Sequence, residues 1–213
     1  TLQRRSSTAL SVHTEITDNP ADGSPMTEHD IGFIHGRFQI LHNDHLRYLL
    51  AGKSRCRFLV VGITNPDPTH ATLQPTNPER DLPESNPLTY YERQCLIAEA
   101  LTEAQVPNAE FCIVPFPIHQ PQLYQHYAPP DAVFFLTIYD DWGRHKLALF
   151  ESLGIRCHVL WERPLSRKGI SAQEVRRLMI QGEAWEHLVP PAVARLLTQW
   201  RIPARLATRR AHP

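Results

Sequence analysis

Two histidines spaced three residues apart, His42 and His45, are the clearest chemical signal in the sequence. They follow a short apolar run and the turn Gly36–Gln39, and they begin a segment with helical periodicity. Side chains three apart share one face of a helix, so both imidazoles can point into one cleft. Free N–H groups and the positive dipole end at a helix start attract phosphate. The pattern predicts a phosphate-binding site, and a pair of ordinary structural histidines is the alternative.

A second segment, residues 169–179, carries complementary chemistry far along the chain. Ser171 precedes a predicted helix and can cap it, and Glu174, three residues later, would complete a capping box. Arg176 lies in the first turns, where a guanidinium can bind phosphate oxygens in a bidentate manner. We expect Ser171, the open N–H groups and Arg176 to bind β- and γ-phosphates. Lys168 either reaches the same phosphates or stays solvated, and Arg177 is expected on the surface.

The elements that must position these residues alternate along the chain. Apolar runs of strand length lie at residues 31–35, 58–63, 110–114, 132–137 and 157–161. Helical candidates lie at residues 44–52, 88–104, 121–127, 142–153, 172–181 and 191–200. Such alternation predicts a single Rossmann-like α/β domain, a doubly wound parallel sheet of about five strands with helices on both faces. The chemistry-bearing segments all follow strands, so we expect them at one edge of the sheet.

The remaining segments bound this domain. Residues 1–29 are polar and without periodicity, which predicts a flexible extension, and residues 30–203 form the predicted domain. Residues 65–87 contain six prolines and no apolar period, and we interpret them as a lid or an oligomer-contact arm, with a disordered insert as the alternative. Residues 204–213 are expected to be a solvated C-terminal tail.

Composition excludes several classes of protein. The formal net charge of the 213 residues is zero and the sequence has no basic stripe, so neither nucleic acid nor an acidic membrane surface is an expected partner. No apolar run approaches the roughly 20 residues of a membrane span, and residues 1–25 lack the apolar core of a signal peptide. The four cysteines show no metal-binding spacing, and we expect buried free thiols in a cytoplasmic protein.

The paired motifs, GRFQ with HxxH and then ISxxEVR, resemble those of the HxGH-type nucleotidyltransferases, most closely the archaeal-type nicotinamide mononucleotide (NMN) adenylyltransferases. The likeness covers roughly residues 31–192 and includes residues 86–93 and 182–190. It implies in-line attack of an acceptor oxygen on the α-phosphorus of a nucleoside triphosphate, with no covalent intermediate. Pyrophosphate would leave, and Mg²⁺ would bridge phosphates with few protein ligands.

The resemblance also implies roles for individual residues. His42 and His45 would contact the α- to γ-phosphates, and Arg176 would contact the leaving pyrophosphate. The nucleotide would also meet a cleft floor and rim formed by Gly36, Arg37, Phe38, Gln39, Lys168 and Ser171.

Departures from the family pattern concern the acceptor. Asp44 replaces the HxGH glycine, and it is either a helix N-cap pointing away or a Mg²⁺ ligand; Ile40 replaces a proline. A Thr-Gly-Asn turn that helps hold the nicotinamide nucleotide is replaced after Thr137. The acceptor-binding residues expected instead are Tyr124, Thr137, Tyr139, Asp141, Trp142 and Arg144. Structural roles stay open for two of these, Asp141 as a helix N-cap and Trp142 as core packing.

Bulky residues at this turn favour a small acceptor. In this the chain is similar to the phosphonate-pathway cytidylyltransferases, which transfer CMP from CTP to small phosphonates. We therefore expect CTP and a small phosphonate or phosphate acceptor of the phosphonoformate type as partners. Two alternatives remain: adenylyl transfer from ATP to NMN, and a catalytically silent nucleotide-binding regulator. Analogy with the family also raises the prospect of a homo-oligomer.

Overall fold

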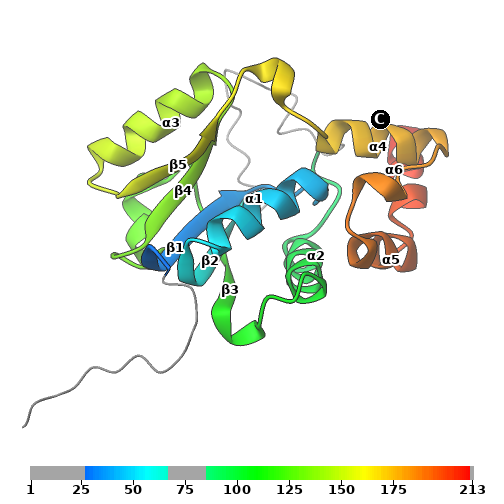
Figure 1. Cartoon of the computed structure of the whole chain (residues 1–213). Helices are drawn as coiled ribbons and strands as arrows, with labels where there is room; N and C mark the ends of the chain where they lie inside the picture. The colour runs from blue at the N-terminus through cyan, green and yellow to red at the C-terminus, as the bar shows by residue number, and fades with distance from the viewer. Residues whose placement is uncertain (1–26, 67–84, 212–213) are drawn as a thin grey trace, which may run out of the picture.

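The computed structural model describes residues 27–66 and 85–211, and it contains one five-stranded parallel sheet (Figure 1). The strands are β1 (His29–Gly36), β2 (Cys56–Thr64), β3 (Phe111–Phe116), β4 (Val133–Ile138) and β5 (Cys157–Glu162). Their spatial order is β3-β2-β1-β4-β5, and every pairing is parallel. The predicted doubly wound α/β sheet is confirmed.

Helices connect the strands and extend the chain beyond them. The α-helices are α1 (Asn43–Lys53), α2 (Tyr90–Glu103), α3 (Asp141–Ser152), α4 (Ala172–Gln181), α5 (Pro191–Gln199) and α6 (Ile202–Ala211). Short 3₁₀ turns lie at η4 (Asn108–Glu110), η5 (Pro121–His126), η6 (Leu165–Arg167) and η7 (Glu186–Leu188). The helix expected at 121–127 is thus a 3₁₀ segment that begins with a proline.

Two separate apolar cores lie on the two faces of the sheet. Alternate side chains of a strand point to opposite faces, so Phe33 of β1 belongs to one core and Ile34 to the other. Phe150 of α3 packs into the core of Phe33, whereas Leu49 of α1 and Leu96 of α2 pack into the core of Ile34. The central strands are consequently buried on both sides, as continuous apolar runs predict.

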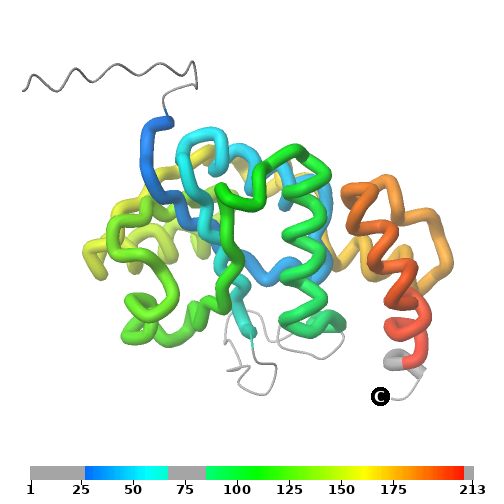
Figure 2. The backbone as a smooth tube through the Cα atoms, turned by 90° about the horizontal axis from the view of Figure 1, so that it is seen from below, coloured from blue at the N-terminus to red at the C-terminus, as the bar shows by residue number. Residues whose placement is uncertain are grey.

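The sheet reverses its winding direction between β1 and β4, the two strands that pair at its centre. In open parallel sheets the crevice for ligands lies outside the carboxyl ends of the strands at such a reversal. The loops after β1, β2, β4 and β5 therefore surround one crevice. The last of these loops leads into α4, which lies in a helical group with α5 and α6 to one side of the sheet (Figures 1 and 2).

The structure corrects two expected boundaries. Strand β1 begins at His29, inside the stretch assigned to the extension. Residues beyond 203 continue as α6, with Leu206 only 2% exposed and Arg205 paired to Glu92 of α2 at 2.6 Å (Nη2 to Oε1). The arginine-rich composition concealed an apolar pair four residues apart, Ile202 and Leu206, which anchors the helix.

Other expectations fall partly or wholly outside the described residues. Most of the proline-rich insert, residues 67–84, and nearly all of the extension, residues 1–26, lie there. All four cysteines are free, but only Cys56 is fully buried, whereas Cys95, Cys112 and Cys157 are half-buried. Within the described ranges, no helix is both long enough and apolar enough to span a bilayer.

Candidate active site

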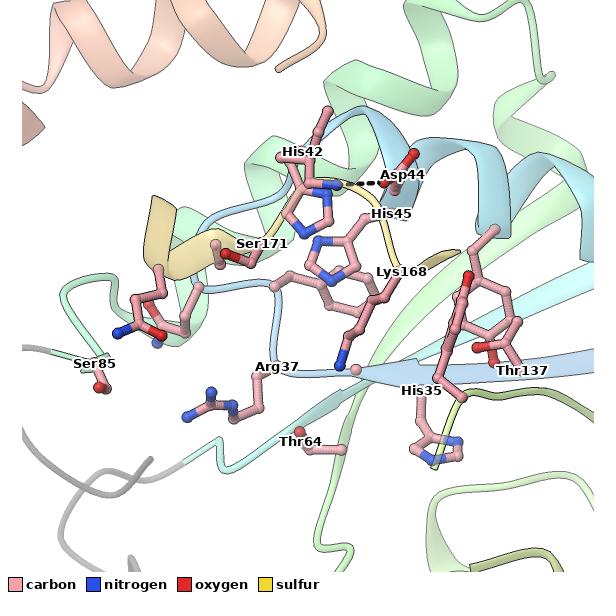
Figure 3. Close-up of a pocket in the computed structure, with 18 of the residues that line it drawn as sticks. His35, Arg37, His42, Asp44, His45, Thr64, Ser85, Thr137, Lys168 and Ser171 are labelled. Atoms are coloured by element: carbon pink, nitrogen blue, oxygen red, sulfur yellow. Dashed lines mark hydrogen bonds between the residues drawn. The ribbon is translucent and has the colours of Figure 1, made fainter. Parts of the chain in front are cut away.

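A cavity of about 790 Å³ opens at the carboxyl edge of the sheet. It is lined by residues that sequence reasoning assigned to nucleotide binding, namely Gly36, Arg37, Phe38, Gln39, His42, His45, Lys168, Ser171 and Arg176. The turn after β1 and the segment before α4 therefore contribute to one space although they are more than 120 positions apart. Figure 3 shows the labelled members of this set around the end of β1.

His42 and His45 stack against each other beside the start of α1. Their ring centroids are 3.7 Å apart with an interplanar angle of 22° (Figure 3). The pKa of His42 is lowered to about 4, mainly by burial of the ring. The charge of Asp44 has a smaller, raising effect, and the charge of Lys168 a smaller, lowering effect. Burial, followed by the neighbouring His42, also lowers the pKa of His45 well below its usual value. Both imidazoles are therefore neutral near pH 7, and each carries one N–H donor.

The Nδ1 atoms of both histidines are buried and lack a hydrogen-bond partner among the described residues. Buried polar atoms in native proteins are almost always paired, so unpaired ones in a cavity indicate a ligand or water. The neutral rings are suited to contact an anion through N–H donation. The two histidines lie together in one cleft as predicted, and phosphate binding by them stays a prediction.

Gly36, expected in the floor of the cleft, makes room for a neighbouring aromatic ring. It is the last residue of β1 and its φ is not positive; the left-handed residue of this turn is Phe38, with φ 52°. A Cβ on Gly36 would lie 2.9 Å from Cζ of Phe38. The glycine thus makes room for the Phe38 ring, which meets His45 edge to face at 5.2 Å between centroids.

Arg93 of α2, a residue that sequence reasoning did not assign to the site, holds the turn in place. Its guanidinium donates to the backbone oxygens of Arg37 (3.0 Å), Thr64 (2.8 Å) and Asn65 (2.8 Å). Burial lowers the pKa of Arg93 to about 10. The side chain joins the ends of β1 and β2. The sequence signal that could have pointed to Arg93 is its position one residue after Glu92, the glutamate of the capping box at the start of α2.

Gln39 is also a structural member of the turn. Its side-chain amide exchanges two hydrogen bonds of 2.9 Å with the backbone of Leu88. Its backbone oxygen accepts a hydrogen bond from the guanidinium of Arg176. Because Arg176 is 8% exposed and lines the cavity, this contact fixes the α4 arginine beside the turn of the first motif.

Ser171 caps α4 as predicted, and its Oγ accepts the N–H of Glu174 at 3.1 Å. The expectation that the Glu174 side chain completes a capping box is wrong. The carboxylate of Glu174 pairs with Arg177 at 2.8 Å instead of reaching back to the cap. Arg177 is exposed, as expected, but it also contributes to the rim of the cavity.

Asp44 links the two motifs. One carboxylate oxygen accepts the N–H of Ile170 at 2.7 Å, and the other accepts from Arg47 at 2.8 Å. The N-cap position of α1 belongs to His42, so the N-cap interpretation of Asp44 is wrong. A Cβ at Gly169 would lie 2.2 Å from Oδ2 of Asp44, which shows how closely the two segments approach.

Part of the expected acceptor site lines the same cavity. Thr137, Tyr139 and Trp142 are all cavity residues. Trp161 donates to the Tyr139 hydroxyl at 2.8 Å, and Nζ of Lys168 lies 5.9 Å from the Tyr139 ring centroid. Trp142 is 43% exposed, so the core-packing alternative is wrong for this residue.

The other three expected acceptor residues are not in the cavity lining. Tyr124 is buried, donates to the Ile118 oxygen at 2.5 Å and packs 4.6 Å from the Phe116 ring, so it is a core residue. Asp141 and Arg144 are exposed and pair with each other at 3.0 Å. The N-cap of α3 is Asp140, which accepts the Gly143 N–H at 2.9 Å, so that alternative for Asp141 is also wrong.

Several cavity residues were not anticipated. They are His35, Thr64, Ser85, His119, Asp140, Lys146 and Trp161. A polar residue in the last two positions of a buried strand, as at His35, was a signal available in the sequence. The others depend on loop conformation, which spacing does not reveal.

At the carboxyl edge of a doubly wound parallel sheet, two buried histidines, a buried arginine and a serine-capped helix line one cavity, an arrangement suited to nucleotidyl transfer. The chain belongs to the cytidylyltransferase-like family, whose pattern it matches over residues 33–178. It is 55% identical, over 82% of its length and 94% of the relative, to a phosphonoformate cytidylyltransferase of Streptomyces viridochromogenes. It is 32% identical, over 79% of its length and 82% of the relative, to a nicotinamide-nucleotide adenylyltransferase of Thermococcus kodakarensis.

Among solved structures, a bifunctional NMN adenylyltransferase/ADP ribose pyrophosphatase of Francisella tularensis superposes with a TM-score of 0.61. The sequence identity is 16%, and the alignment covers 86% of this chain and 54% of that one. This likeness concerns the fold alone. The sequence-based assignment to the nucleotidyltransferases, with its cytidylyltransferase branch, is confirmed by the family match and the two relatives.

Proposed function

We propose that this protein transfers the cytidylyl group of CTP to a small phosphonate of the phosphonoformate type and releases pyrophosphate. The observation that carries the proposal is the 55% identity to a phosphonoformate cytidylyltransferase, which spans 94% of that relative. The lining of the cavity supports it. Three bulky side chains, Tyr139, Trp142 and Trp161, take up part of its lining, which favours a small acceptor.

In the proposed reaction, a phosphonate oxygen attacks the α-phosphorus of CTP. A new P–O bond forms as the bond from the α-phosphorus to the bridging oxygen breaks, and the electron pair leaves with pyrophosphate. No nucleophilic side chain is required, so catalysis comes from orientation and from stabilising charge on the phosphoryl oxygens.

Each side chain has a defined part in this scheme. The N–H groups of His42 and His45 would donate to oxygens near the α-phosphorus. Arg176 and the N–H groups at the start of α4, behind Ser171, would bind the pyrophosphate oxygens. Lys168 borders the same space and would add a positive charge.

A divalent cation fits this site if the phosphates supply most of its ligands. Both oxygens of Asp44 are engaged, by Ile170 and Arg47, so the Asp44 carboxylate is not a free metal ligand. Mg²⁺ commonly keeps waters and binds substrate phosphates with few protein groups. We propose Mg²⁺ in this role, where it would neutralise charge on the triphosphate. The four free thiols suit a reducing compartment, and we propose the cytoplasm.

A pyrophosphate-release assay tests the proposal, with CTP or ATP as donor and phosphonoformate or NMN as acceptor. We expect turnover with CTP plus phosphonoformate. In that assay His45→Ala should lose about 10²–10⁴ in rate, equivalent to about 3–5 kcal/mol. Turnover only with ATP plus NMN would replace the proposal by adenylyl transfer, the activity named for the 32% identical relative. Triphosphate binding without any pyrophosphate release would indicate the regulator.

A further inference from the structure

His35 is a buried histidine that the phosphate-binding scheme does not use. It is 7% exposed, lies one residue before the end of β1 and lines the cavity. Four phenyl rings surround it, those of Phe33, Phe116, Phe134 and Phe150, at centroid distances between 5.4 and 6.5 Å. Both of its ring nitrogens are buried without a hydrogen-bond partner among the described residues. An imidazole left unpaired in apolar surroundings is destabilising, so it calls for a ligand or another explanation.

Lys146 of α3 lines the same cavity as His35. Burial, and then the positive charge of Lys146, lowers the pKa of His35 well below its usual value. His35 is therefore a neutral donor close to an ammonium group. Figure 3 shows His35 on the opposite side of the end of β1 from His42 and His45, so it belongs to a different part of the cavity from the stacked pair.

The surrounding groups favour an anion in this part of the cavity. Gly143 lies in the first turn of α3, the helix that carries Lys146, and the N-terminus of this helix carries a partial positive charge. Asp140 brings one carboxylate to the cavity, but its Oδ1 is occupied as the cap of α3 by the Gly143 N–H. A cation, an imidazole N–H and a helix N-terminus all favour a carboxylate or phosphonate. They are poor neighbours for a positively charged pyridinium ring such as that of NMN.

We propose that His35 and Lys146 bind the acid group of the acceptor that does not react. This inference rests on the proposed function and assigns its acceptor specificity. In a two-ended acid such as phosphonoformate, the phosphonate attacks the α-phosphorus and the carboxylate is held by His35 and Lys146. The pair thereby selects an acidic acceptor over a cationic one.

The variants His35→Phe and Lys146→Gln test the inference with two acceptors, phosphonoformate and methylphosphonate, which lacks the carboxylate. Each variant should raise KM for phosphonoformate about 10- to 100-fold, as expected for loss of a hydrogen bond to a charged group. KM for CTP and turnover of methylphosphonate should stay within about threefold, and Lys146→Arg should restore part of the loss. Lys53→Gln is the matched control, because it also removes a lysine charge but one that pairs with Glu110 and is not part of the cavity lining.

Two results would overturn the inference. One is an equal loss for both acceptors, and the other is unchanged KM for phosphonoformate. His35→Phe should unfold at a temperature at least as high as wild type, because it removes unpaired polar atoms from an apolar site. A lower unfolding temperature, with both acceptors equally impaired, would mark His35 as merely structural.

A binding measurement separates this inference from the proposed function. If wild-type protein transfers CMP to no phosphonate, the proposed function fails. The imidazole ¹⁵N resonances of His35, assigned by their loss in His35→Phe, are then followed while phosphonoformate is added. A shift that is abolished in Lys146→Gln supports acid binding by this pair. Resonances that do not move in the wild-type protein refute it.

Discussion

Asp44→Ala removes the contact that joins the histidine motif to the arginine motif. Oδ2 of Asp44 accepts the Ile170 N–H at 2.7 Å, one residue before the Ser171 cap of α4. A hydrogen bond to a charged group contributes about 1.5–3 kcal/mol. If that energy positions α4 for the transition state, kcat/KM should fall roughly 10- to 150-fold at about 1.4 kcal/mol per tenfold. The assay is steady-state pyrophosphate release with CTP as the varied substrate.

Asp44→Asn is the informative companion because an amide oxygen can still accept the Ile170 N–H. It should retain more activity than Asp44→Ala, with a loss of about tenfold or less. Arg47→Ala is the control. The Arg47 side chain is 68% exposed and pairs with the other oxygen of Asp44, so kcat/KM should change by less than about threefold.

Metal binding by Asp44 would give a different pattern. Both Asp44 variants would then be equally inactive, and raised Mg²⁺ would restore them. That outcome, or full activity of Asp44→Ala, would refute the positioning role.

Two further predictions concern stability. Because the folded-state pKa of His42 is about 4, against an ordinary value of 6.5, the folded protein resists protonation there and stability is lost as pH falls from about 6.5 to 4. In urea titrations across that window, His42→Gln should reduce the pH slope of the unfolding free energy by roughly 1.4 kcal/mol per pH unit. Equal slopes for the variant and the wild-type protein would contradict the burial argument. Arg93→Met should cost at least about 2 kcal/mol, because it leaves three backbone oxygens of the turn without their charged donor. Chemical denaturation checks this against exposed Arg195→Met, and an unchanged midpoint would show that Arg93 is dispensable.

The strand and helix order followed from the sequence because each central strand is an unbroken apolar run buried on both faces. The convergence of the residues proposed to bind phosphate was equally predictable. His42, His45 and Ser171 lie at the starts of strongly patterned helices, and Arg176 lies within the first turns of one of them. Helix starts that follow strands must meet at one edge of a parallel sheet. Local periodicity therefore predicted that these four residues lie close together.

The residues expected to bind the acceptor were harder to place, because their positions depend on side-chain directions that spacing does not reveal. Tyr124 faces the core because the 3₁₀ segment η5 turns it toward Phe116. The cap of α3 falls on Asp140, one residue before the expected Asp141, and this shift leaves Asp141 and Arg144 in solvent. Asp44 reaches a backbone N–H 126 positions away, a contact that only the folded chain defines.

The most direct test of the convergence of the two motifs is a crystal structure with a non-hydrolysable CTP analogue. We expect imidazole nitrogens of His42 and His45 within about 3.2 Å of phosphate oxygens. The guanidinium of Arg176 should contact the terminal phosphates of the same molecule. A triphosphate bound outside this cavity, or one that touches the histidines while Arg176 stays bonded only to Gln39, would contradict a shared polyphosphate site.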